Sequence, residues 1–133
     1  MSMEIITTED KVIASILIPA DYKPSATSFI TSPELAQQVG FVVYPAGGVI
    51  KRHIHKNTDR QSCSCSEALF VREGRLEIDI FDENKKLLAT RELSAGDFVL
   101  MVSGGHGFRV LEATVLLEVK LGPYGGAADK ELF

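Results

Sequence analysis

Two histidines, His53 and His55, are separated by a single residue in the stretch VIKRHIH. In a β-strand, successive side chains alternate between faces, so both imidazoles would point the same way. Neutral imidazoles are common ligands of divalent transition metals, so the pair is typical of half a metal site. The candidates for the other half are Glu67, which opens the next apolar run, and His106 in SGGHG. Together these residues predict a metal site with open coordination positions, as a metal-based catalyst needs.

Other potential ligands lie between the histidine pair and Glu67. Asp59 follows His55 more closely than Glu67 does and is the alternative carboxylate ligand. Cys63 and Cys65 are too close in the chain for an unstrained disulfide, so we interpret them as reduced thiols. If this segment is extended, both cysteines share a face with Glu67, which would place a thiolate beside the metal. Both interpretations of the cysteines stay open at this point.

The elements that would position these residues are short β runs. RLEIDIF alternates strictly, with Leu76, Ile78 and Ile80 on one face, which predicts a half-buried strand. Turn residues recur between such runs, and this spacing favours an all-β sandwich or barrel. The predicted strands from Gly40 onward cover residues 41–45, 49–55, 67–74, 75–82, 87–93, 98–102, 108–113 and 114–122.

Three other segments complete the predicted organisation. Residues 4–19 predict one strand or a broken pair near a sheet edge. Residues 32–38 begin with Ser-Pro-Glu, a helix-start signal that allows at most a short helix or 3₁₀ turn before Gly40. The glycine-rich stretch SGGHG predicts a tight loop that brings His106 in from a neighbouring strand.

Taken in order, the motif residues resemble the cupins, small jelly-roll β-barrels with a metal in the mouth or centre. Gly47, His53, His55, Glu67 and Gly74 follow the first cupin motif, except that the interval between His55 and Glu67 is longer. The second motif is matched less closely: the chain has Gly96, Gly104 and His106, but Val102 stands in place of its proline. The resemblance implies one cupin domain over 1–133, an all-β double-stranded β-helix, with motifs near 47–74 and 96–110.

The resemblance also implies a function. One divalent transition metal (Fe, Mn, Ni or Zn) would act as a Lewis acid or dioxygen site on a small organic, anionic substrate. A first alternative is a metal-independent ketoisomerase or epimerase of nucleotide-linked sugars, with histidine as the base. A second is a non-catalytic barrel that senses a ligand or a metal. Small cupins usually pair, so we expect a homodimer, in which the apolar N-terminal strand could extend a neighbour's sheet.

Composition and charge argue against several other classes of protein. The chain has 133 residues with 45% hydrophobic content, enough for one core. Its net charge is −4 without a large lysine or arginine cluster, so nucleic acid is not an expected partner. No apolar run approaches the roughly 20 residues that span a bilayer, and no signal peptide is evident. We therefore expect a cytoplasmic protein without a membrane partner.

Overall fold

The computed structural model describes residues 1–53, 55, 66–120 and 131–133. The chain forms two compact units, which we treat separately: Met1–Tyr22 with Cys65–Phe133, and Lys23–Ser64. All regular secondary structure in the described residues is β-strand. Within the same ranges, no helix is long and apolar enough to cross a membrane. The all-β class is thus confirmed, whereas a single cupin domain over 1–133 stays a prediction.

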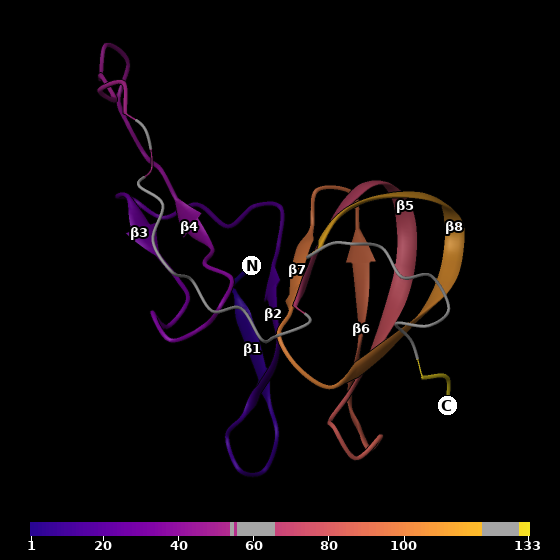
Figure 1. The fold of residues 1–133 in the computed structure, drawn as a ribbon. Helices are drawn as coiled ribbons and strands as arrows, with labels where there is room; N and C mark the ends of the chain where they lie inside the picture. Colours follow the sequence, from indigo (N-terminus) through magenta and orange to yellow (C-terminus); the bar gives the residue numbers. More distant parts are fainter. Residues whose placement is uncertain (54, 56–65, 121–130) are drawn as a thin grey trace. The chain divides into compact units, whose positions relative to one another are not determined.

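The larger unit is one antiparallel sheet that curls strongly into a half-barrel (Figure 1). The strand order is β1-β2-β7-β5-β6, and β8 pairs with β5 off this path. The predicted broken pair near the N-terminus is present as the antiparallel strands β1 and β2. The bounds of the strands are β1 Glu4–Thr7, β2 Ile13–Ile18, β5 Glu67–Phe81, β6 Leu87–Ser94, β7 Phe98–Met101 and β8 Gly105–Lys120.

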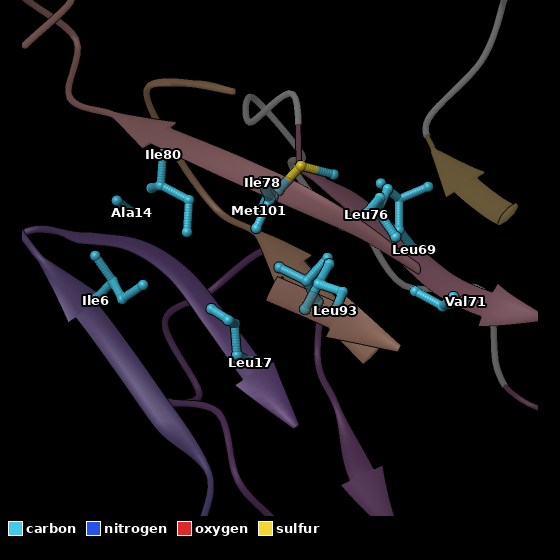
Figure 2. Close-up of a cluster of buried hydrophobic side chains, with 11 residues drawn as sticks. Ile6, Ala14, Leu17, Leu69, Val71, Leu76, Ile78, Ile80, Leu93 and Met101 are labelled. Carbon is cyan, nitrogen blue, oxygen red and sulfur yellow. The ribbon is translucent and has the colours of Figure 1, made fainter. Parts of the chain in front are cut away.

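Alternating side chains build the core of this sheet. Leu76, Ile78 and Ile80 on β5 are all fully buried, as the alternation of RLEIDIF predicts. They pack with apolar side chains of the neighbouring strands, as Figure 2 shows. The other buried members of this cluster are Ile6, Ala14, Leu17, Leu69, Val71, Leu93, Val99 and Met101.

The strands β5 and β8 pair along their full lengths, from Glu67 opposite Lys120 to Phe81 opposite Gly105. The register shifts around Gly74, which has a φ of +91°. A side chain there would overlap the carbonyl oxygen of Ala113, so the close approach of β8 requires glycine. A bulge of this kind increases the bend and twist of a strand. The β5–β8 ribbon therefore curls as a continuous pair.

Several strand boundaries predicted along β5 and β8 were wrong. The predicted strands 67–74 and 75–82 are one strand, Glu67–Phe81, because Gly74 bends the backbone without ending the ladder. The segments 108–113 and 114–120 likewise belong to one strand, while 121 and 122 lie outside the described residues. His106 lies on β8 and not in a loop, because Gly104, with a φ of +75°, makes the turn before it. The predicted turns at 82–86 and 94–97 are confirmed.

The smaller unit contains, among its described residues, only the two-residue strands β3 (Ser28–Phe29) and β4 (Gly40–Phe41), paired antiparallel. The predicted strand 41–45 therefore does not extend past Phe41, and the described part of 49–55 is not a strand. A turn follows β4, in which the Gly48 amide donates to the Pro45 carbonyl at 3.0 Å. A strand needs a paired backbone, and in the described part of this unit the pairing ends with β4.

The helix-start signal at 32–38 produces a turn and not a helix. The Leu35 amide donates to the Ser32 carbonyl at 3.0 Å, which closes a single turn. The Gln38 side-chain amide then donates to the carbonyls of both Ser32 and Leu35. These bonds satisfy the carbonyls that a longer helix would have used, so the segment ends after one turn.

Candidate functional site

Glu67 and His106 lie side by side in the larger unit. Glu67 Oε2 is 3.6 Å from His106 Nε2, and their side chains are 22% and 30% exposed. Strand alternation places Glu67 on the same face of β5 as the buried Leu69 and Val71. His106 lies opposite the fully buried Ile80, so it belongs to the same concave face. The sequence predicted these two residues as ligands of one site, and the fold brings their side chains together.

The residues around this pair carry further charge and aromatic surface. Lys120 lies opposite Glu67 in the β5–β8 register, and its ammonium is 3.6 Å from Glu118. The His106 ring is 5.7 Å from the ring of Phe108, two residues further along β8. Lys120 was not among the candidate ligands predicted from the sequence. Only the long-range register of β5 and β8 reveals its place opposite Glu67.

A small cavity of about 280 Å³ borders His106 and Phe108. The segment 131–133 forms its other wall, and the ring of Phe133 packs against Phe81 at 5.0 Å between centroids. Lys85 holds this segment through an ion pair with Glu131 at 2.6 Å. His106 therefore borders a cavity with aromatic walls.

In the smaller unit, His53 and His55 are also adjacent, although they do not lie on a strand. Their ring centroids are 5.0 Å apart, and the ring planes are nearly perpendicular. Both residues are exposed. His53 Nδ1 lies 2.8 Å from the carbonyl oxygen of Lys51. Since a carbonyl only accepts hydrogen bonds, Nδ1 must carry the proton. In the neutral ring the lone pair is then on Nε2, the arrangement that ligating histidines commonly show.

The remaining candidate ligands, Asp59, Cys63 and Cys65, lie outside the described residues, as does most of the long interval between His55 and Glu67. Within the ranges that the structure describes, no three histidine, cysteine or acidic side chains gather closely enough to hold a metal ion. The described donors therefore form two pairs, one in each unit, and the assignment of all four ligands to one ion stays a prediction.

Comparison with known proteins assigns no family. No family model matches the chain, and neither a curated protein nor a solved structure matches it. A function is therefore proposed from the sequence motifs, the curled sheet and the two pairs of donor side chains.

Proposed function

We propose that this chain is a metal-binding protein of the cupin type, whose ion is held by His53, His55, Glu67 and His106. The observation that carries the proposal is the approach of Glu67 to His106 on the concave face of the curled sheet. These residues come from distant parts of the sequence, and the family resemblance implies a ligand role for both. The expected ion is one divalent Fe, Mn, Ni or Zn.

The described donor atoms fit such an ion chemically. Imidazole nitrogen with carboxylate oxygen is a common ligand combination for divalent transition metals. Two donors that each lie about 2.1 Å from an ion can be at most about 4.2 Å apart. The separation of 3.6 Å between Glu67 Oε2 and His106 Nε2 satisfies this limit. The Nδ1 hydrogen bond of His53 leaves its Nε2 as the donor toward a metal.

The proposed role is that of a metal-dependent enzyme. The bound ion would supply Lewis acidity or a dioxygen site for a small organic substrate. The chain itself would contribute orientation and charge. Phe108 provides an aromatic surface next to His106, while the exposed Lys51 and Arg52 adjoin His53 in sequence. These two cations favour the approach of an anionic substrate.

The same pair of side chains supports a second candidate function without metal. A carboxylate beside an imidazole orients the ring and stabilises its protonated form, as general acid–base catalysis requires. In that case Glu67 would position His106 as the base of a ketoisomerase or epimerase acting on a nucleotide-linked sugar. The distance of 3.6 Å allows this role as well.

Elemental analysis distinguishes the two candidates. The full chain is expressed in medium supplemented with Fe, Mn, Ni and Zn, reconstituted with each, dialysed and analysed beside a His53→Ala/His55→Ala double variant. The metal proposal predicts about one ion per chain in the wild type and its loss in the variant. Absence of metal from reconstituted wild-type protein would contradict it and leave the acid–base candidate.

A further inference from the structure

A second cavity, of about 450 Å³, lies in the larger unit away from the Glu67–His106 pair. The pair is near the Met101 end of β7, because Glu67 lies opposite Met101. The cavity is at the other end of β7, where Phe98 lies opposite Ile18. Its volume is in the range of small-molecule sites, about 300 to 1,000 Å³.

The floor of this cavity is apolar and well packed. Leu17, Ile18, Leu93 and Phe98 line it, and each of these residues is less than a tenth exposed. They come from β2, β6 and β7 and form part of the packed sheet (Figure 2 shows Leu17 and Leu93). An apolar body placed here would be removed from water against a preformed surface.

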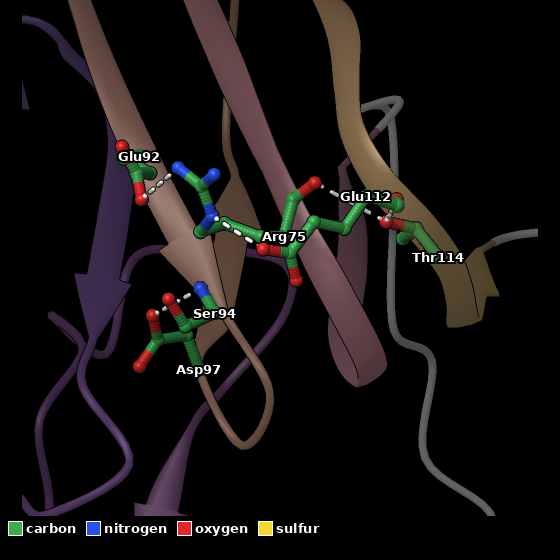
Figure 3. A network of polar contacts seen from close by, with 6 residues as sticks. All are labelled: Arg75, Glu92, Ser94, Asp97, Glu112 and Thr114. Atoms are coloured by element: carbon green, nitrogen blue, oxygen red, sulfur yellow. Dashed lines mark hydrogen bonds and ion pairs between the residues drawn. The ribbon is translucent and has the colours of Figure 1, made fainter.

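The charged groups at the rim do not cancel. The N-terminal ammonium of Met1, which also lines the cavity, is paired with Asp21 at 2.7 Å. Arg91 is neutralised by Glu4, which accepts hydrogen bonds from its Nε and Nη2. Glu92 bonds Arg75 at 2.9 Å, but Arg75 also bonds Glu112 at 3.2 Å, so one guanidinium serves two carboxylates (Figure 3). Glu92, Arg75 and Glu112 together therefore carry a net negative charge, and Glu92 brings it to the rim of the cavity.

Asp97 adds a second negative charge. Its Oδ1 accepts the Ala20 amide at 3.0 Å, and its Oδ2 accepts the Ser94 amide at 2.8 Å (Figure 3 shows the latter bond). Within the part of the chain that the structure describes, no ion pair joins this half-buried carboxylate to a lysine, arginine or histidine. The negative charge lies beside Phe98, next to the apolar floor.

We infer that this cavity binds an amphiphilic amine, with the apolar body on the floor and the ammonium group near Asp97 and Glu92. An ammonium group provides hydrogen-bond donors as well as charge for the free lone pairs of these carboxylates. A carboxylate ligand of the same shape would meet like charge at the rim. The site is independent of the proposed metal, and it favours the opposite charge from the substrate expected there.

The test uses the full chain and three probes of equal length: n-octylamine, n-octanol and octanoate. NMR titrations follow the methyl groups of Leu17, Ile18 and Leu93. We expect saturable binding of n-octylamine at these methyl groups, at least about tenfold tighter than octanoate at low salt, with the ratio decreasing as salt is added. n-Octanol should bind with intermediate affinity.

Two variants test whether Asp97 causes the preference for the amine. Asp97→Asn should weaken n-octylamine binding several-fold, whereas Glu73→Gln, which removes an exposed charge elsewhere on β5, should leave it unchanged. If circular dichroism shows that Asp97→Asn is unfolded, Glu92→Gln replaces it. Equal affinity for all three probes, no shift of the cavity methyl groups, or equal effects of the Asp97 (or replacement Glu92) and Glu73 variants would each overturn the inference.

Discussion

Glu67 and His106 lie at opposite ends of the paired β5–β8 ribbon, yet their side chains approach to 3.6 Å. Glu67 pairs with Lys120 at one end, and His106 pairs with Ile80 near the other. Two ends of a flat ribbon of this length could not meet, since each strand residue adds about 3.3 Å. The curl of the ribbon at Gly74 is therefore what assembles the candidate site.

Substitution of Gly74 tests whether the bend of the ribbon depends on this glycine. A Cβ at Gly74 would overlap the Ala113 carbonyl oxygen, and its φ of +91° strains any L side chain. We expect Gly74→Ala to lower the free energy of unfolding by about 1–3 kcal/mol. Urea unfolding followed by circular dichroism measures this change, because the chain has no tryptophan for fluorescence.

Gly107 on the same ribbon provides the matched control. It does not have a positive φ, and a Cβ there would meet no atom within 4 Å. Gly107→Ala should therefore change the free energy of unfolding by no more than about 0.5 kcal/mol. Similar losses in the Gly74 and Gly107 variants would show that the bend does not depend on the glycine conformation.

The alternating face of β5 makes a second prediction. Ile78 is fully buried, so Ile78→Ala should lower the free energy of unfolding by about 2–5 kcal/mol through lost burial and cavity formation. Val110 on β8 is 65% exposed, and Val110→Ala should cost no more than about 0.5 kcal/mol. The urea midpoints and slopes of both variants measure these costs. Equal costs would mean that Ile78 is not part of the packed core.

The ion pairs on the sheet predict a dependence of stability on pH. The hydrogen-bonding guanidinium of Arg109 holds the pKa of Asp79 below its ordinary range, and the Thr90 hydroxyl donates to the same carboxylate at 2.6 Å. Because the pKa is lower in the folded state, this stabilisation is full above the ordinary aspartate pKa of about 3.9. It is lost as the pH falls from there through the folded-state pKa.

Arg109→Gln should therefore destabilise the protein at neutral pH, and the deficit relative to wild type should shrink as the pH falls through and below about 3.9. Urea midpoints across this pH range measure the deficit. Arg72→Gln is the control, because Arg72 is exposed and forms no ion pair with another described residue. A deficit for Arg109→Gln that stays constant with pH would contradict the assignment.

Much of the sheet could be predicted because its signals are local. The alternation of RLEIDIF and the polar turns beside β6 were interpreted correctly from short windows. The continuity of β5 through Gly74 could not be predicted in this way, because a glycine that ends one strand and a glycine that bends another look alike. Residues 49–53 show the opposite error, since this short run between turn residues was predicted as a strand but does not form one.

The candidate site was predicted in part for a different reason. The motif spacing singled out Glu67 and His106 as ligands of one ion. Their side chains lie side by side, the shared ion stays a prediction, and His106 lies on a strand and not in the predicted loop. Their distance depends on the curl of β5 and β8, which involves residues far apart in sequence. The place of Lys120 opposite Glu67 depends on the same register, so no short segment could reveal it.

The zinc affinity of Glu67 and His106 variants, measured by competition with a chelating dye, tests the proposed metal site most directly. Glu118→Gln is the matched control, because Glu118 lies on β8, opposite Leu69, and is not a proposed ligand. The metal proposal predicts about one ion per chain in wild type and control, and affinity reduced at least about tenfold in Glu67→Gln and His106→Ala. Equal affinity in all four proteins, or no binding by the wild type, would contradict it.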